Sequence, residues 1–300
     1  MAARWRPAEL ADLTGTTAVV TGANVGIGFH TARELAAHGA DVVLACRNMD
    51  AAAEAARRMP GTTRLERLDL ASLDDVRRFV GDWSGPLDLL VNNAGVMTPP
   101  RFRRTADGHE LMFGTNHLGH VALTAGLVPA LLESPAPRVV TVSSIAHHSG
   151  DQRVLEANPE SGYRPPPYYG NSKLANLLFA LELQRRASAA GSPLVSTAAH
   201  PGVSATNLVA SPEGMGANAV VRAAAPYVMP LLFQSAARGA DPVLYAATAA
   251  EPGSYTGPGS LRESRGPIGP ARLSRHARDE QLAAQLWDLS NELTGATWPF

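Results

Sequence analysis

Tyr169 and Lys173 are separated by four positions in the sequence Tyr-Gly-Asn-Ser-Lys. On a helix this spacing places both side chains on one face, one turn apart. The charge of an ammonium group favours the phenolate form and lowers the pKa of a tyrosine, which is about 10 in the free amino acid. Such a phenol is suited to exchanging a proton with an oxygen atom, for example that of a carbonyl group. The spacing alone is also typical of a solvated helix face.

Three glycines, Gly22, Gly26 and Gly28, lie between a β-branched run at 16–21 and a helical pattern at 28–38. A turn of this kind lets the backbone approach a pyrophosphate, whose charge meets the unpaired N–H groups at the start of the helix. The sequence therefore predicts a dinucleotide site here. The spacing is G-x-x-x-G-x-G, which differs from the G-x-G-x-x-G fingerprint, and a turn required only for tight strand–helix packing is the alternative.

Strand and helix patterns alternate along the chain. Strands are predicted at 16–21, 41–46, 64–68, 87–91, 138–142 and 194–198, with a short one near Tyr255. Helices are predicted at 28–38, 51–59, 73–83, 108–132, 169–190, 239–249 and 277–293. This order predicts an α/β fold over residues 1–300: a single-domain, doubly wound Rossmann fold with a mostly parallel seven-stranded sheet and helices on both faces. Ligands are expected at the carboxyl ends of the strands.

The less regular segments are expected to lie over this ligand face. Residues 163–167 and 251–270 are rich in Pro and Gly and are predicted to be loops. Residues 204–238 are predicted to form a substrate-binding lid. Their apolar stretch at 219–233 either contacts a lipophilic substrate or packs as an ordinary helix pair.

The composition, 45% hydrophobic and 18% charged residues, is that of an ordinary globular protein. The formal net charge of -1 gives no field that gathers nucleic acid, so no such partner is expected. Cys46 is the single cysteine, which excludes an intrachain disulfide and a cysteine-based zinc site and indicates a cytoplasmic location. No metal is expected, because the adjacent His147 and His148 have no carboxylate partner. The N-terminus lacks a signal peptide, and no apolar stretch is long enough to span a membrane.

The motifs, taken in order, resemble those of the short-chain dehydrogenase/reductase family. The matching positions are Gly22 to Gly28, Asp69, Asn92-Asn-Ala-Gly95, Asn116, Ser143-Ser144, Tyr169 to Lys173, and Pro201 to Thr206. The resemblance implies an NAD(P)-dependent oxidoreductase that interconverts a carbonyl and an alcohol.

Four catalytic residues follow from the resemblance: Asn116, Ser144, Tyr169 and Lys173. Tyr169 is expected to deliver the proton, and Ser144 to orient the substrate oxygen by a hydrogen bond. Asn116 is expected to hold a water that passes protons to Lys173; the alternative is that Asn116 only repairs a kink in its helix. Ser143 is the fallback for Ser144.

The resemblance also implies a cofactor-binding set: Gly22, Asn24, Gly26, Ile27, Gly28, Arg47, Asp69, Leu70, Asn93, Ala94, Gly95, Tyr169, Lys173, Pro201, Gly202, Val203 and Thr206. The second strand ends in Ala-Cys-Arg-Asn at 45–48, without a carboxylate to bind the ribose hydroxyls of NAD(H). Arg47 offers a charge-assisted partner for a 2′-phosphate, worth roughly 1.5–3 kcal/mol. NADP(H) is therefore the predicted cofactor and NAD(H) remains possible; a solvated loop role for Arg47 is the alternative. Asp41 opens the strand and is too distant to act as the ribose ligand.

The stretch of 25 positions from Ser144 to Tyr169 is longer than is usual in the family. With Asn116-His-Leu-Gly-His120 and Ser144-Ile-Ala-His-His148, it resembles the retinol-dehydrogenase-like branch and its bacterial members. That branch implies a lipophilic or aromatic ketone, aldehyde or alcohol as substrate. A ketoreductase or other tailoring enzyme of specialised, polyketide-like metabolism, a sugar-nucleotide epimerase or dehydratase, and a noncatalytic NADPH-binding sensor are the alternatives. Family members commonly pair through the helices at 108–132 and 169–190, which implies a homodimer or homotetramer.

Overall fold

The central strands of the sheet are short runs of apolar and β-branched residues buried on both faces. In the computed structural model, which describes residues 5–205 and 234–300, they are β1 (Thr17–Thr21), β2 (Asp41–Cys46), β4 (Leu89–Asn92) and β5 (Arg138–Val142). Nearly every side chain in them is buried, as expected for parallel strands covered on both sides.

The sheet continues on either side with β3 (Thr63–Arg67), β6 (Val195–Ala199), β9 (Tyr255–Ser260) and β10 (Arg265–Pro270). The strand order is β10-β9-β6-β5-β4-β1-β2-β3, and every pairing is parallel except that of β9 with β10. The predicted doubly wound Rossmann fold is thus confirmed. A separate parallel pair joins β7 (Ser204–Ala205) to β8 (Gln234–Ser235).

The sheet has eight strands instead of the predicted seven, because residues 265–270 pair with β9. The loop prediction for 251–270 was therefore wrong over most of its length. Glycine and proline in this stretch mask a strand pattern, but main-chain pairing does not depend on side chains and an edge strand tolerates proline.

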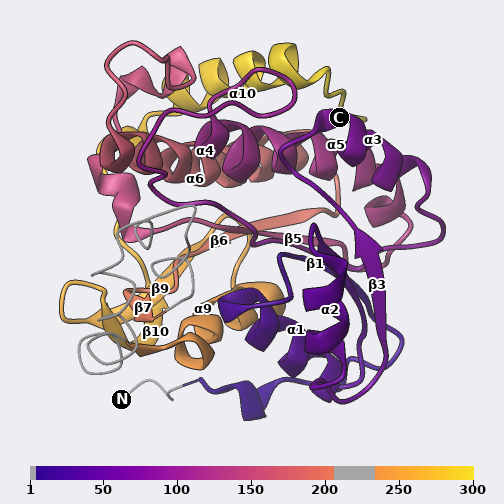
Figure 1. Cartoon of the computed structure of the whole chain (residues 1–300). Coiled ribbons are helices and arrows are strands. Elements are labelled where there is room, and N and C mark those ends of the chain that lie inside the picture. The colour runs from indigo at the N-terminus through magenta and orange to yellow at the C-terminus, as the bar shows by residue number, and fades with distance from the viewer. Residues whose placement is uncertain (1–4, 206–233) are drawn as a thin grey trace.

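Helices cover both faces of the sheet (Figure 1). On one side lie α1 (Gly26–Ala37), α2 (Met49–Ala56) and α9 (Ala236–Thr248). On the other lie α3 (Leu73–Gly81), α5 (Gly119–Leu132) and α6 (Pro165–Ala189), and α10 (Glu280–Thr294) packs outside α5 and α6. No helix among the described residues is long and apolar enough to cross a membrane.

Two local predictions were wrong. The long helix expected at 108–132 is divided into α4 (Leu111–Phe113), a π-helical turn at Gly114–Leu118, and α5. Such turns are frequent at functional sites, and this one contains Asn116. The prolines at 165–167 begin α6 and do not form a loop, because the first turn of a helix has N–H groups that need no partner within the helix.

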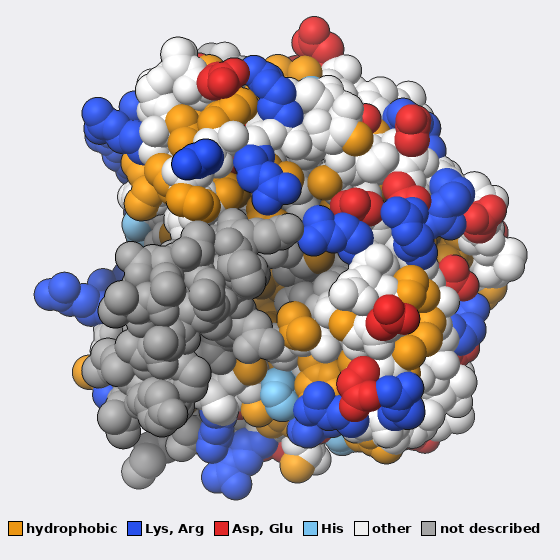
Figure 2. All heavy atoms as spheres, viewed as in Figure 1, with side chains coloured by type: hydrophobic (Ala, Val, Ile, Leu, Met, Phe, Trp, Pro, Cys, Tyr) orange, Lys and Arg blue, Asp and Glu red, His pale blue; other side chains and the backbone are white. Residues whose placement is uncertain are grey.

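Most of the predicted lid, residues 206–233, lies outside the described residues. On the side seen in Figure 2, acidic and basic side chains are intermixed. Among the ion pairs of the described residues are Arg77 with Asp74 at 2.6 Å and Arg104 with Glu160 at 2.9 Å. Exposed pairs of this kind contribute little stability individually.

Candidate active site

A cavity of about 660 Å³ opens at the carboxyl ends of β1, β2, β4 and β5. This is the edge at which a doubly wound sheet binds its ligands. The cavity brings together most of the predicted site residues: Gly22, Asn24, Gly26, Ile27, Gly28, Arg47, Asp69, Leu70, Asn93, Ala94, Gly95, Ser144, Tyr169, Lys173, Pro201, Gly202 and Val203. Asn116 does not line it, and Thr206 lies outside the described residues.

The turn between β1 and α1 requires glycine for two separate reasons. Gly22 has a φ of +65°, which L-amino acids with a side chain rarely adopt. A Cβ atom at Gly28 would lie 2.5 Å from the carbonyl oxygen of Gly22. The close turn places the start of α1, Gly26 to Gly28, in the cavity wall, and the N-terminus of a helix is suited to holding a pyrophosphate.

Thr21 and Asn93 fix this turn to the loop after β4. The Thr21 hydroxyl accepts hydrogen bonds from the backbone N–H groups of Asn93 and Ala94, both at 2.9 Å. The Asn93 amide donates to the Thr21 carbonyl at 2.8 Å. The floor of the cavity is therefore held by contacts between two strands that are adjacent in the sheet.

His120 supports the same floor and was given no role from the sequence. Its Nδ1 donates to the Asn116 carbonyl and its Nε2 lies 2.9 Å from the Thr21 hydroxyl. Burial lowers the pKa of His120 to about 4, so the imidazole is neutral at physiological pH. The motif Asn-His-Leu-Gly-His contained this residue, but only the fold shows that it reaches Thr21.

Arg47 lies on the exposed rim of the cavity, one residue beyond the end of β2. The neighbouring Asn48 caps α2 by accepting a hydrogen bond from the Ala51 N–H. Leu68, Asp69 and Leu70, which follow the adjacent strand β3, also line the cavity, and Asp69 accepts from the Ala71 N–H at 3.0 Å. The rim therefore presents a guanidinium group where a 2′-phosphate is expected.

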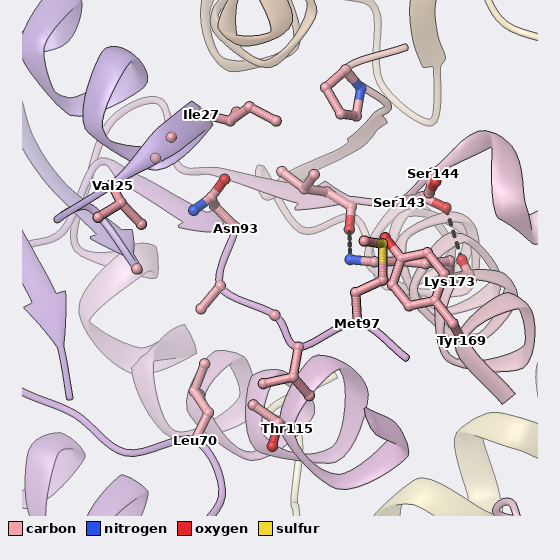
Figure 3. Close-up of a pocket in the computed structure, with 18 of the residues that line it drawn as sticks. Val25, Ile27, Leu70, Asn93, Met97, Thr115, Ser143, Ser144, Tyr169 and Lys173 are labelled. Carbon is pink, nitrogen blue, oxygen red and sulfur yellow. Dashed lines mark hydrogen bonds between the residues drawn. The ribbon is translucent and has the colours of Figure 1, made fainter. Parts of the chain in front are cut away.

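Tyr169, Ser144 and Lys173 meet at the other end of the cavity (Figure 3). Burial raises the pKa of Tyr169 to about 12, and a hydrogen bond with the Ser144 hydroxyl opposes this rise. The predicted lowering of this pKa by Lys173 is not present in this arrangement. The Lys173 ammonium donates to the Val142 carbonyl at 3.1 Å and lies 5.9 Å from the centre of the Tyr169 ring. Burial lowers the pKa of Lys173 itself to about 8.

The two adjacent serines have different roles. Ser143 is buried and donates its hydroxyl to the backbone carbonyl of Lys173 at 2.7 Å. Ser144 accepts from the Ala146 N–H and hydrogen bonds with Tyr169. The geometry thus favours Ser144 over Ser143 as the substrate-facing hydroxyl.

Asn116 is held by the loop after β4. Its Oδ1 accepts from the Val96 N–H at 2.7 Å, and its Nδ2 donates to the Val96 carbonyl and to the Ser172 hydroxyl, both at 3.0 Å. A Cβ atom at Gly95 would lie 3.0 Å from the Asn116 Oδ1 and 3.6 Å from the Lys173 Nζ. Asn116 and Lys173 therefore approach each other around Gly95, with the Asn116 side chain engaged in protein contacts.

Sequence reasoning missed several apolar residues of the cavity wall: Val25, Val96, Met97, Ile145 and Ala146. All follow or lie within the recognised motifs. Their side chains carry no chemical signal of their own, and only their position in the fold shows that they face the cavity.

Comparison with known proteins identifies the family. The family model described as "short chain dehydrogenase" matches residues 16–213. Polyprenol dehydrogenase of Mus musculus is 40% identical over 97% of this chain and 88% of that protein. Retinol dehydrogenase 13 of Homo sapiens is 37% identical over 96% of this chain and 87% of that protein.

Two solved structures agree with this result. An uncharacterized protein from Mycobacterium paratuberculosis matches with a TM-score of 0.83 and 42% identity, covering 99% of this chain and 100% of that one. The RhlG/NADP complex from Pseudomonas aeruginosa matches 81% of this chain and 94% of that one with a TM-score of 0.63, and at 24% identity it shows the fold alone. The chain therefore belongs to the short-chain dehydrogenase family, within its retinol-dehydrogenase-like branch, and is an oxidoreductase acting on CH–OH and C=O groups.

Proposed function

We propose that the protein is an NADPH-dependent carbonyl reductase, or alcohol dehydrogenase in reverse, that acts on a lipophilic or aromatic ketone or aldehyde. The observation that carries this proposal is one continuous cavity with the glycine turn and Arg47 at one end and Ser144, Tyr169 and Lys173 at the other. When bound, NADP(H) supplies or receives the hydride.

Tyr169 is the proposed proton donor. With its pKa raised to about 12, the phenol is protonated at neutral pH and can deliver a proton to a carbonyl oxygen. Ser144 hydrogen bonds with the same phenol and orients the substrate oxygen beside it. Lys173, whose pKa of about 8 is close to physiological pH, is placed to replace the proton that leaves this site. A protonated Tyr169 supports reduction of a carbonyl as the favoured direction of the reaction.

The proposed preference for NADP(H) rests on Arg47 at the rim and on the lack of a carboxylate at 45–48. The glycine turn and the wall formed by Asp69 and Leu70 would hold either nicotinamide cofactor, since both share the pyrophosphate and adenine. The Arg47 guanidinium group would bind the 2′-phosphate, and the lack of a carboxylate at 45–48 leaves that phosphate unopposed there.

A lipophilic substrate is supported by the apolar wall around Tyr169 and by the relatives. Met97, Ile145 and Val203 line the cavity, and Ile145 directly follows Ser144 in the sequence. The names of the similar proteins, polyprenol dehydrogenase and retinol dehydrogenase, refer to long apolar alcohols. We therefore propose retinaldehyde and comparable apolar aldehydes as first substrates to assay.

The decisive test is NADPH oxidation with retinaldehyde and aromatic aldehydes by the wild type and by Tyr169→Phe. The variant should lose about 10²- to 10⁴-fold in kcat, because a general acid contributes a factor of this order. NADPH binding, measured by fluorescence, should persist. Turnover that survives in Tyr169→Phe would refute the mechanism, and binding without any turnover in the wild type would favour the noncatalytic sensor.

Lys173 is the only lysine in the sequence, so amine-selective labelling of side chains reports on the protonation of this residue. The rate of labelling at Lys173, resolved by peptide mass spectrometry, should rise through a midpoint near pH 8 because only the neutral amine reacts. A midpoint above pH 10 would contradict the proposed proton supply.

We also propose a homodimer or homotetramer, as implied by the family, but not through the faces first expected. Residues 170–180 of α6 are all buried, and Leu282 and Leu286 of α10 belong to the same apolar cluster as Leu174 and Leu178. Because α10 packs outside α5 and α6, we propose that the subunits pair through another surface. Light scattering measures the number of subunits in the assembly.

We also propose a cytoplasmic location, on the basis of the single buried cysteine, Cys46.

A further inference from the structure

The turn of the β9–β10 hairpin packs directly on the predicted nicotinamide segment, Pro201 to Val203. The Ser264 carbonyl accepts a hydrogen bond from the Val203 N–H at 3.0 Å. A Cβ atom at Gly202, whose φ is +67°, would lie 2.5 Å from the same carbonyl. The hairpin therefore fixes the backbone of a cavity wall to which it is not adjacent in sequence.

His200, the residue before this segment, is buried between the segment and the hairpin. Its Nδ1 accepts from the Gly202 N–H at 3.2 Å, which leaves the proton of the neutral ring on Nε2. That Nε2 makes no well-aligned hydrogen bond among the residues that the structure describes. The Glu263 carboxylate, itself mostly buried, is 3.4 Å away. A Cβ atom at Gly257 would overlap the His200 ring, so β9 leaves space for it.

The hairpin turn holds Glu263 in a costly conformation. Leu261, Arg262 and Glu263 have φ values of 48°, 55° and 63°, three consecutive non-glycine residues in the left-handed region. Such residues cost of order 1–3 kcal/mol each and persist only where the surrounding structure holds them. Glu263 supplies one such contact by accepting from the Arg272 N–H at 2.9 Å. The same side chain that faces His200 therefore helps to hold the strained turn.

We propose that Glu263 is a positioning residue for the nicotinamide half of the cofactor, acting through His200 on the Pro201–Val203 segment. Its carboxylate faces the buried His200 N–H and anchors the hairpin turn at Arg272, and the opposite ring nitrogen of His200 receives the Gly202 N–H. This inference rests on the proposed binding of NADP(H). It concerns a residue that lies outside the cavity lining and outside every motif of the sequence.

The test compares two ligands on the full-length protein by isothermal titration calorimetry. NADPH contacts both ends of the cavity, whereas 2′,5′-ADP contains only the adenine end. Glu263→Ala removes the hydrogen bond from the Arg272 N–H to the carboxylate and the negative charge that faces His200. The variant should weaken NADPH binding by about tenfold, the usual effect of losing a hydrogen bond to a charged group, and leave 2′,5′-ADP binding within twofold of wild type. Glu263→Gln retains an acceptor oxygen for the Arg272 N–H and should recover part of the NADPH affinity.

Leu261→Gly is the matched control, because it relieves strain in the same turn and retains the carboxylate. It should leave the ratio of the two affinities unchanged. An equal loss of affinity for both ligands in Glu263→Ala and Glu263→Gln would overturn the proposal. An unchanged affinity for NADPH in both variants would also overturn it. Should Glu263→Ala fail to fold, the Gln variant alone decides. A wild type that binds neither ligand would instead refute the proposed function.

Discussion

The two ends of the cavity are built in different ways. The glycine end depends on backbone geometry: Gly22 and Gly28 leave space, and Thr21 joins two adjacent strands. The catalytic end depends on buried ionisable side chains from distant parts of the chain, including His147, His200 and Tyr255. The backbone turn of the glycine end is therefore limited by volume, and its charge recognition comes from Arg47 at the rim. A site held by buried polar groups is sensitive instead to protonation and to the loss of single atoms.

The largest effect should come from pH. Burial lowers the pKa of four histidines far below 6.5: His117 and His200 to about 3, and His120 and His147 to about 4. In the unfolded chain these rings take up protons below pH 6.5, while in the folded chain they stay neutral. Their contribution to stability is therefore complete above pH 6.5 and is lost as the pH falls towards 4. The free energy of unfolding should drop by several kcal/mol, at about 1.36 kcal/mol per pH unit for each ring.

Urea unfolding at pH 7.5, 6.5, 5.5 and 4.5 measures this slope. His120→Asn at the glycine end and His200→Gln at the catalytic end should each lower the slope of the unfolding free energy against pH by the equivalent of about one proton. Glu110 acts in the opposite sense, since burial raises its pKa, and moderates the fall. A flat stability between pH 6.5 and 4.5 would show that the buried rings take up protons without unfolding.

Arg47→Ala tests the rim of the glycine end. The KM for NADPH should rise by about ten- to a hundredfold, because a charge-assisted hydrogen bond to phosphate is worth roughly 1.5–3 kcal/mol. The KM for NADH, which has no 2′-phosphate, should stay within twofold. Steady-state kinetics with both cofactors gives the comparison, and an equal rise for both would assign Arg47 a structural role. Arg77→Ala on α3 removes an exposed charge remote from the cavity lining and serves as the control.

Gly28→Ala tests the claim that the glycine end is limited by volume. The added methyl group would lie 2.5 Å from the Gly22 carbonyl, and overpacking of this kind costs about 1–3 kcal/mol. NADPH and 2′,5′-ADP should both bind about ten- to a hundredfold more weakly, in contrast to Glu263→Ala. Gly81→Ala, where a Cβ atom has open space, is the matched control. Normal binding by Gly28→Ala would mean that the turn can shift.

The same difference explains what the sequence could predict. The glycine turn, Arg47 and Asn93 to Gly95 lie next to the strands that place them, so motif order was sufficient to bring them to one cavity. Glu263 and His120 have contacts across long distances in sequence, in stretches whose local pattern indicates a loop or an ordinary helix. The short strand near Tyr255 was predicted, but its contact with Ser144 was not. The π-helical turn that contains Asn116, and the hydrogen bonds of Asn116 with Val96, are not revealed by helical periodicity. The pKa of Tyr169 depends on burial and on the hydrogen bond with Ser144, neither of which the four-residue spacing to Lys173 reveals.

Tyr255→Phe should have the smallest effect on activity. It should change the catalytic end of the cavity and leave the glycine end unaltered. The Tyr255 hydroxyl donates to the Ser144 carbonyl at 3.5 Å, and the same carbonyl accepts from the His147 Nδ1 at 2.7 Å. Loss of this long, neutral hydrogen bond should cost about 0.5–1.5 kcal/mol and lower kcat by about two- to tenfold. The KM for NADPH should not change, because Tyr255 does not line the cavity and phenylalanine keeps the ring that packs on His200. Stopped-flow measurement of a single turnover isolates the chemical step, and a change confined to cofactor affinity would place the influence of Tyr255 on the nicotinamide segment instead of on Ser144.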